Sequence, residues 1–377
     1  MISTFTESNF DENRHLRYNS GMPRIEKVLS TTKKAIPDSS SLGFGQYFSD
    51  HWFYSKFSDD RGWFESRVEP YGVIPLDPAA SVFHYGQALF EGMKAFLQKD
   101  GSISVFRPEF NYHRLQEGAE RLCLHAPPKD IFMAGLGEVI TADKRWVPSE
   151  DNCSLYIRPT LIGTEGFLGV RPSREILFYI LLSPVGSYYA TGSAPVKIWV
   201  EEKALRAAPG GLGATKAGAN YAASLQAALE AKKKGYAQVL WLDVERDGIE
   251  EVGTMNVFFV FKNEIVTPAL NGSILAGGVR DSVLQLLRHN GVKVSERRVT
   301  MGEVVERQKS GELLEAFGTG TAAVISPIGE FCYQGQTMLV NNGRMGSVSM
   351  EIFNTISGVQ RGTQPDKFGW MKRIEDL

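Results

Sequence analysis

The sequence predicts an α+β protein built from two domains. Its 377 residues are enough for about two domains of roughly 100–200 residues each. Stretches typical of strands and of helices mix without the regular β–α–β alternation of a doubly wound sheet, and no GxGxxG motif follows a predicted strand. The small-residue stretch "SYYATGSAP" separates the two halves. We expect an N-terminal domain over residues 1–187, a linker over 188–195 and a C-terminal domain over 196–377.

The first half shows several strands and one clear helix. Residues 1–40 are polar and are expected to form a loosely ordered lead-in. Alternating aromatic and polar residues predict strands in "FGQYFSDHWFYSKF" and "GWFESRVEPYGVIPLDPAA". A "KDG" turn separates strands expected around Met93–Phe96 and Ile103–Phe106, and branched apolar residues predict buried strands in "SLYIRPTLIG" and "EILFYILLSPVG". A helix is predicted by the spacing of Phe110, Leu115, Ala119 and Leu122.

The second half begins again with a strand, in "VKIWVEEKALRA". A helix is expected over Ala219–Lys234, ending at Gly235, and a strand follows in "QVLWLD". The segment "TMNVFFVFKNEIVTP" predicts a hairpin with its turn at Lys262–Asn263. A helix in "VRDSVLQLLRHNG" ends at Gly291, and a late strand leads into "FGTGTAAVISPI".

Composition excludes several classes of function. The 41 basic and 43 acidic residues leave a net charge of -2, which offers no electrostatic surface for nucleic acid or an anionic membrane. The three cysteines form no CxxC pair, the N-terminus lacks the apolar segment of a signal peptide, and no run of 18 apolar residues exists, so we expect a cytoplasmic protein. The six scattered histidines predict no dedicated metal site.

One lysine, Lys216, stands in the stretch "APGGLGATKAGANYAAS", which consists mostly of glycine and alanine. A phosphate-binding loop needs glycine before the lysine and a hydroxyl residue after it, whereas Thr215 and Ala217 flank this one. Among small apolar neighbours the ammonium group is poorly solvated, which lowers its pKa and favours the neutral amine. Such an amine can form a Schiff base with an aldehyde. The alternative interpretation is a lysine on a solvent-facing loop.

Four further features suit the same kind of ligand. Glu250 and Glu251 point to different sides of a predicted strand, so one of them can face inward and pair with a protonated pyridine nitrogen; the alternative is two exposed acids. The glycines of "LNGSILAGGVRDS" precede a helix start, which favours a phosphate or serves only a tight turn. The "FGTGTAA" stretch (317–323) offers amides and hydroxyls to oxyanions, and Arg107 suits a phosphate or carboxylate unless it lies on the surface. Taken together, these groups match pyridoxal phosphate.

Eight segments, in chain order, resemble the branched-chain amino acid aminotransferases, which belong to the fold type IV class of pyridoxal-phosphate enzymes. The segments lie between residues 42 and 330 and are "HYGQALFEGMKAF" (84–96), "FRPEFNYHRL" (106–115), "LYIRPTLIG" (155–163), "GATKAGANYAAS" (213–224), "QVLWLD" (238–243), "EEVGTMNVFFV" (250–260), "LNGSILAGGVRDS" (270–282) and "FGTGTAAVISP" (317–327). The resemblance implies a small N-terminal and a larger C-terminal α/β domain with the cofactor between them.

The resemblance also implies roles for individual residues at the cofactor. Lys216 matches the Schiff-base lysine, which also carries the proton between the substrate Cα and the cofactor C4′. Glu251 matches the partner of the pyridine nitrogen, and Tyr221 matches the hydrogen-bond donor to the cofactor O3′. The remaining cofactor positions are Arg107, Gly278, Val279 and Thr321 around the phosphate and Thr254 on the far side of the ring.

The substrate positions follow from the same matches. Tyr85 and the Thr321–Ala322 backbone match the site of the substrate α-carboxylate, and Arg158 matches the residue that meets the second carboxylate of glutamate. The pocket walls match Phe44, Phe90, Tyr156 and Tyr188. An apolar wall with one arginine at its edge can accept both leucine-like and glutamate substrates.

The implied reaction is the reversible transfer of the amino group of L-leucine, L-isoleucine or L-valine to 2-oxoglutarate. The segment "EGFLGV" (165–170) resembles a loop that reaches the partner's site, which implies a homodimer with Gly166–Val170 at the interface. Some family members carry a CxxC after the "GTA" motif; "AVIS" (323–326) replaces it here and excludes thiol regulation at that place. Two alternatives stay open: a D-amino acid transaminase or aminodeoxychorismate lyase of the same fold, and a non-catalytic phosphate- or nucleotide-binding module.

Overall fold

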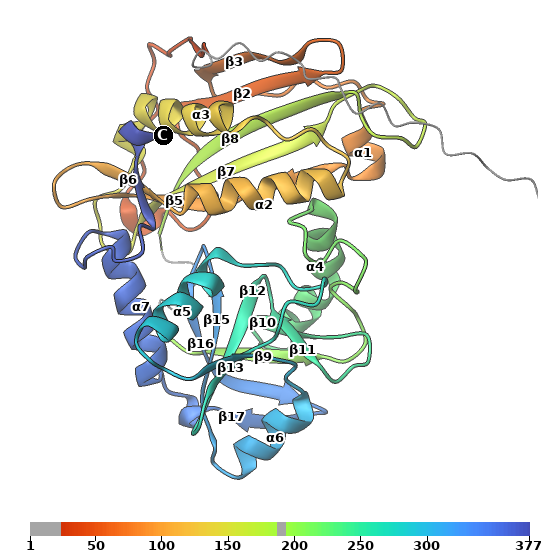
Figure 1. Ribbon diagram of the computed structural model, residues 1–377, viewed down its shortest axis with the longest axis vertical. Helices are drawn as coiled ribbons and strands as arrows, with labels where there is room; N and C mark the ends of the chain where they lie inside the picture. Colours follow the sequence, from red (N-terminus) through yellow and green to blue (C-terminus); the bar gives the residue numbers. More distant parts are fainter. Residues whose placement is uncertain (1–23, 187–193) are drawn as a thin grey trace, which may run out of the picture.

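The computed structural model describes residues 24–186 and 194–377, and these residues form two sheets that lie one above the other (Figure 1). Each sheet has nine strands in the described part of the chain. The α+β class with two domains is confirmed, because helices cover the sheets without a regular β–α–β alternation. Short 3₁₀ segments occur at Ser39–Ser41, Lys144–Trp146, Asn341–Gly343 and Ile374–Asp376.

The first sheet carries the N-terminal domain, and its strand order is β1-β3-β2-β8-β7-β5-β6-β18, with β4 paired to β7. Helices α2 and α3 pack on one face around Leu115, Phe132 and Phe178, which are fully buried. The strands are β1 (Glu26–Lys27), β2 (His51–Ser58), β3 (Gly62–Pro70), β4 (Ala88–Phe90), β5 (Met93–Leu97), β6 (Ile103–Phe106), β7 (Ser154–Gly163), β8 (Glu175–Val185) and β18 (Met371–Arg373), and the helices are α1 (Ser81–Tyr85), α2 (Pro108–Arg121) and α3 (Lys129–Ala142).

The second sheet carries the C-terminal domain, and β11 pairs with both β10 and β12, which closes six strands into a ring. Apolar side chains such as Val257 and Phe331 fill the ring, and α5 and α7 pack on its outside over Phe317. The strands are β9 (Val196–Glu201), β10 (Gln238–Leu242), β11 (Ile249–Val252), β12 (Met255–Phe261), β13 (Ile265–Thr267), β14 (Val294–Glu296), β15 (Leu313–Gly320), β16 (Val324–Tyr333) and β17 (Gln336–Leu339), and the helices are α4 (Gly218–Lys233), α5 (Gly278–His289), α6 (Met301–Lys309) and α7 (Ser347–Gln360).

The predicted helices and most predicted strands of both halves are confirmed at their positions, but residues 44–50 and 71–80, which were expected to belong to strands, form none. Residues 188–193 of the expected linker lie outside the described residues. Helix α4 ends just before Gly235 and α5 just before Gly291, and both glycines have the left-handed backbone that a helix end requires. Helix α3 was not predicted. It is buried on most sides, so its sequence lacks the polar face that marks an amphipathic helix.

The last residues of the chain return to the first domain, which corrects the range 196–377 expected for the C-terminal domain. Strand β18 pairs antiparallel with β6 of the first sheet, and Ile374 is buried in the first core. Figure 1 shows the C-terminus beside α3. The free edge of β6 and the apolar surface beside α3 explain this return, because both need to be covered.

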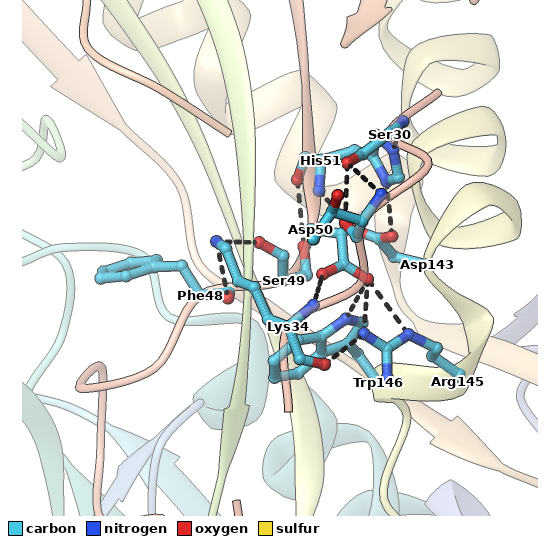
Figure 2. Close-up of polar contacts among 10 residues, drawn as sticks. Ser30, Lys34, Phe48, Ser49, Asp50, His51, Asp143, Arg145 and Trp146 are labelled. Carbon is cyan, nitrogen blue, oxygen red and sulfur yellow. Dashed lines mark hydrogen bonds and ion pairs between the residues drawn. The ribbon is translucent and has the colours of Figure 1, made fainter. Parts of the chain in front are cut away.

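Residues 24–40 are anchored, which corrects the lead-in expected over residues 1–40. The backbone N–H of Ser30 donates to Nε2 of His51 (2.8 Å), and the backbone N–H of Lys34 donates to Oδ1 of Asp50 (2.9 Å). Figure 2 shows that these contacts belong to one polar cluster, in which Asp143 and Arg145 lie beneath His51 and Asp50. Residues 1–23 lie outside the described residues.

Asp143→Ala is expected to lower the free energy of unfolding by about 2–4 kcal/mol, because it leaves two buried donors unpaired. Asp143 is 1% exposed, and its carboxylate accepts the backbone N–H and the Nδ1–H of His51, each at 2.7 Å. Urea unfolding of the variant beside wild type measures the change. Glu120→Ala removes an exposed acid from α2 and serves as the control. A loss no larger than that of the control would contradict the role of the cluster.

Candidate active site

Lys216 lies directly before α4, at the junction of the two domains. Its backbone carbonyl accepts the N–H of Phe90 (3.2 Å), and Ala217 forms a bridge with Leu89, so strand β4 of the first domain holds the lysine loop. The Nζ atom donates to the hydroxyl of Tyr221 (2.9 Å). Burial, aided by Arg114, lowers the pKa of Lys216 to about 8. About a tenth of this amine is therefore neutral at pH 7, far more than for an ordinary lysine, and the neutral amine is the form that nucleophilic attack requires.

Tyr221 stands one turn into α4 and faces the same amine. Burial raises the pKa of the Tyr221 phenol to about 12, and Glu251 adds to the effect. The hydroxyl therefore stays protonated and keeps its own hydrogen to donate while it accepts one from Lys216. Tyr221, Glu251 and Thr254 line one cavity, so three of the predicted cofactor residues are brought together.

Glu251 is the acid of the adjacent pair that faces this cavity. It is 3% exposed on β11, and its Oε1 accepts the N–H of Leu275 (2.7 Å) and lies 3.3 Å from Nη2 of Arg206. Burial raises the pKa of Glu251, against the opposing charge of Arg206. Its Oε2 has no hydrogen-bond partner among the residues that the structure describes. Glu250 is also buried, but its Oε1 accepts from Asn271 and Ser273, and it does not line the cavity.

The four residues predicted to surround a phosphate line one further cavity: Arg107, Gly278, Val279 and Thr321. Helix α5 begins at Gly278 and has no side-chain cap, so the N–H groups of its first turn are available to an anion. Arg107 donates to the carbonyl of Gly278 (3.0 Å) and forms an ion pair with Asp281 (2.6 Å). Its guanidinium is thereby held at the start of α5.

A wall of four predicted substrate residues in mutual contact leads from Phe44 to Lys216. Ring centroids of Phe44 and Tyr156 are 4.9 Å apart, and Nη2 of Arg158 donates to the Tyr156 hydroxyl (2.9 Å). Arg158 lies 4.5 Å above the ring of Phe90, and Nζ of Lys216 lies 4.9 Å from the centre of the same ring. Tyr156 and Arg158 share one face of β7, because alternate residues of a strand point to the same side.

Four predicted substrate residues do not belong to this wall: Tyr85, Tyr188, Thr321 and Ala322, of which Thr321 lines the phosphate cavity. Tyr85 is 42% exposed on α1, and its hydroxyl donates to the backbone carbonyl of Leu168. Tyr85 therefore contributes to the surface formed by the 166–170 loop. Within the described residues, its side chain makes no contact with Lys216. Tyr188 lies outside the described residues. Ala322 follows Thr321 in the turn between β15 and β16.

Sequence reasoning missed a fully buried ion pair behind the lysine. Glu91 is 0% exposed and receives two hydrogen bonds from Arg114, each at 2.7 Å, and a third from Asn111 (2.7 Å). Burial alone would raise the pKa of Glu91, but Arg114 holds it below the usual value. The signal was a single acid within the apolar run "ALFEGM", which needs a buried partner. Arg206, the partner of Glu251, carried no comparable signal.

The residues present fit pyridoxal phosphate. The amine of Lys216 matches the aldehyde of the cofactor, and the acid Glu251 matches the pyridine nitrogen. The uncapped start of α5, together with Arg107, matches the phosphate. Glu251 lines the cavity beside Tyr221, so its Oε2 is open to a hydrogen-bond donor placed there. Oε2 of Glu250 is also without a partner in the described residues, but it is fully buried and Glu250 does not line the cavity. This fold and this site together define a protein of the pyridoxal-phosphate enzyme class.

The comparisons with known proteins agree with this class. A sequence model of the family described as amino-transferase class IV matches residues 88–331. A relative from Bacillus subtilis (strain 168), named branched-chain-amino-acid aminotransferase 2, is 49% identical over 354 residues, which cover 94% of this chain and 98% of the relative. The chain belongs to the class IV aminotransferases, and within them to the branched-chain-amino-acid aminotransferases. Its cofactor is pyridoxal phosphate.

Solved structures show the same fold. The branched-chain amino acid aminotransferase of Escherichia coli superposes with a TM-score of 0.72 at 26% identity, and the match covers 86% of this chain and 99% of that one. The branched-chain aminotransferase of Thermoproteus uzoniensis, solved with norvaline, has a TM-score of 0.69 at 23% identity, covering 85% and 99%. The second likeness supports the fold alone.

Within residues 24–186 and 194–377, no helix is long and apolar enough to cross a membrane. The same ranges hold no group of three or more histidine, cysteine, aspartate or glutamate side chains that could bind a metal ion.

Proposed function

We propose that this aminotransferase reversibly moves the amino group of L-leucine, L-isoleucine or L-valine to 2-oxoglutarate. The observation that carries the proposal is the wall from Phe44 through Tyr156 to Phe90, which is aromatic and leads to Lys216. Such a wall suits a branched aliphatic side chain, since contact with it removes apolar surface from water. The name of the B. subtilis relative supports the same substrate class.

Each residue around Lys216 has a separate role in the proposed reaction. When bound, pyridoxal phosphate supplies an aldehyde for the amino group and a ring that delocalises negative charge. Lys216 would hold the aldehyde carbon covalently, and its amine, once freed, would take the proton from the substrate Cα and deliver it to the former aldehyde carbon on the other side of the nitrogen. Glu251 would keep the ring nitrogen protonated and Tyr221 would donate to the ring oxygen, since both line the same cavity. The start of α5 and Arg107 hold the phosphate.

Arg158 lets the same pocket accept 2-oxoglutarate. Its guanidinium lies over Phe90 and bonds to Tyr156, so a charged group is present at the edge of an otherwise aromatic wall. A distal carboxylate can meet this arginine, whereas a leucine side chain covers only the rings. One site thereby serves both substrates of the reaction.

A panel of L-leucine, D-alanine and aminodeoxychorismate tests the proposed substrates. Purified enzyme with pyridoxal phosphate and 2-oxoglutarate should form glutamate from L-leucine. Turnover of D-alanine or of aminodeoxychorismate in place of L-leucine would instead assign one of the two other chemistries known for this fold.

Arg158→Met is expected to raise the KM for 2-oxoglutarate by about 10–100-fold, because a charge-assisted hydrogen bond is lost. The KM for L-leucine should change little, because methionine keeps an apolar surface of similar length. Steady-state kinetics with each substrate varied in turn measures both values. Arg174→Met, which changes an exposed arginine at the start of β8, is the control. An equal rise in both KM values would contradict the role of Arg158.

We also propose that the enzyme acts as a homodimer in which Gly166–Val170 reaches the partner's site. Leu168 is 62% and Val170 is 86% exposed, and Tyr85 bonds to this loop. Exposed apolar groups gathered at one place are typical of an interface. Tyr85 would then complete the α-carboxylate site of the partner, which explains why it does not face Lys216 of its own chain.

Leu168→Asp is expected to convert the dimer into monomers and to lower activity, because a charge would be buried at the interface. Sedimentation of the variant beside wild type measures the mass. Leu229→Asp on α4, which also changes an exposed leucine, is the control. A wild-type protein that sediments as a monomer would contradict the proposal.

A further inference from the structure

The last residue of β4 and the two residues after it form a short segment of the first domain that contacts the second domain. The backbone N–H of Phe90 donates to the carbonyl of Lys216 (3.2 Å). The carbonyl of Gly92 accepts the hydroxyl of Thr321 (3.2 Å), in the turn between β15 and β16. Two separate parts of the candidate active site, the loop of the lysine and the turn at the phosphate cavity, are therefore bound by residues only two positions apart.

Glu91, between these two residues, binds a third part of the site through Arg114 of helix α2. Nε and Nη2 of Arg114 donate to the two carboxylate oxygens, each at 2.7 Å, and Nη1 donates to the carbonyl of Ala276 (2.7 Å). Ala276 stands two residues before Gly278, where α5 begins at the phosphate cavity. Figure 1 shows α2 on the side of the first sheet nearest the second domain. The guanidinium thus bridges the two domains.

Burial and the shape of the guanidinium fix the direction of this bridge. Glu91 and Arg114 are both buried, and Asn111 of the same helix donates a third hydrogen bond to the carboxylate (2.7 Å). A guanidinium is planar and presents its N–H groups at fixed angles, so two bonds to a carboxylate also set where the third nitrogen points. Another rotamer of Arg114 would leave two buried charges unpaired, which is strongly unfavourable. The carbonyl of Ala276 is therefore held at one place relative to the first domain.

The two charges of the pair act on Lys216 with opposite signs. Beyond the effect of burial, the positive charge of Arg114 lowers the pKa of Lys216 and the negative charge of Glu91 raises it, and the effect of Arg114 is the larger of these two. The other charged and titratable groups that face this amine are Tyr221 on α4, Glu251 on β11, and Tyr156 and Arg158 on β7. Loss of one partner therefore changes the charge at the amine, in a direction that depends on which partner is lost.

We propose that Arg114, held by Glu91, is a positioning residue that fixes the start of α5 relative to Lys216 across the domain junction. The aldehyde and the phosphate belong to one small molecule, so the amine and the phosphate cavity must stand at a set distance to bind both. Arg114 also lines that cavity, but each of its three nitrogens donates to Glu91 or to Ala276, so it acts through these residues. The inference rests on the proposed role of Lys216.

Binding of pyridoxamine 5′-phosphate to the full-length chain measures the positioning, because this molecule has the ring and the phosphate but no aldehyde to bond with Lys216. Arg114→Lys keeps the charge but lacks the fixed fork that holds Glu91 and the carbonyl of Ala276 together. Quenching of intrinsic fluorescence should give a dissociation constant at least about tenfold above that of wild type, the effect of losing a hydrogen bond to a charged group. Glu117→Gln, an exposed change on the same helix, should bind like wild type.

Borohydride trapping of pyridoxal 5′-phosphate on Lys216, after a brief exposure at a series of pH values, measures the charge effect. The pH of half-maximal trapping should fall in Glu91→Gln, where the charge of Arg114 acts unopposed and lowers the pKa of Lys216. It should rise in Arg114→Met, which removes the larger of the two charge effects. We expect each shift to be at least about half a pH unit, roughly threefold in the neutral fraction of the amine. Arg114→Lys should keep the wild-type value.

Shifts in opposite directions distinguish this role from a loss of packing, which would move both variants the same way. Wild-type affinity of Arg114→Lys for pyridoxamine 5′-phosphate, or shifts of the same sign in Glu91→Gln and Arg114→Met, would overturn the proposal. If Arg114→Met does not fold, an unmoved pH of half-maximal trapping in Glu91→Gln would overturn it. A wild-type protein without a label on Lys216 would instead refute the proposed role of the lysine itself.

Discussion

Lys216→Ala is expected to lower turnover of L-leucine by at least about 10²–10⁴-fold, the range that general acid–base catalysis contributes. The loss should be larger than that of any other single change in the site, because the same amine holds the cofactor covalently and moves the proton. Alanine also leaves the phosphate cavity and the wall intact, so binding of the cofactor by its phosphate remains. The result should therefore appear in kcat rather than in folding.

Two measurements check this prediction. Turnover with L-leucine and 2-oxoglutarate gives the loss of rate, and borohydride reduction followed by peptide mass mapping should place the cofactor on Lys216 in wild type. Lys203→Ala changes an exposed lysine of the preceding segment and is the matched control. Near-wild-type turnover of Lys216→Ala, or a label on another lysine, would refute the assignment.

Glu251→Gln is expected to lower kcat on the order of 10²-fold, as does the loss of a single preorganised electrostatic contact in other active sites. Glutamine keeps the shape and the hydrogen bond from Leu275 but removes the negative charge. The ring nitrogen of the cofactor is then no longer kept protonated, and the ring accepts the electron pair of the substrate Cα less readily.

Glu250→Gln provides a matched control for this change. The two acids are adjacent, both are buried, and each substitution removes one charge. Glu250 accepts from Asn271 and Ser273 rather than facing the cavity with Tyr221. We expect kcat of Glu250→Gln to stay within a few-fold of wild type, as is usual for a change that touches no reacting group. Equal losses in both variants would mean that net charge, not contact with the cofactor, accounts for the effect.

Much of the fold was accessible from local pattern. Strands such as β7 and β8 are rich in branched apolar residues, and α4 and α5 end before glycines, which are signals carried by neighbouring residues. Helix α3 escaped prediction because it is apolar nearly all round, so it has no amphipathic period. Strand β18 escaped because its place depends on the open edge of β6, far away in the sequence.

Some features of the site, like some of the fold, could be predicted from local sequence pattern, and others could not. The small-residue setting of Lys216 and the glycines before α5 could be interpreted without a structure, since they describe what the backbone nearby permits. Glu250 and Glu251 could not be separated by alternation, because both sides of β11 are buried. Tyr85 could not be assigned to its own site or to another, because its contact with Leu168 joins distant segments.

Sequence alone therefore settled the chemical groups: an amine among small residues, acids on one strand, and backbone donors at a helix start. Their arrangement was settled only in three dimensions, where Glu251 rather than Glu250 lines the cavity beside Tyr221, and Phe90 of the first domain contacts Lys216 of the second. The reason is physical. Local propensity and side-chain alternation act over a few residues, whereas burial and the lining of a cavity arise when segments far apart in the sequence pack together.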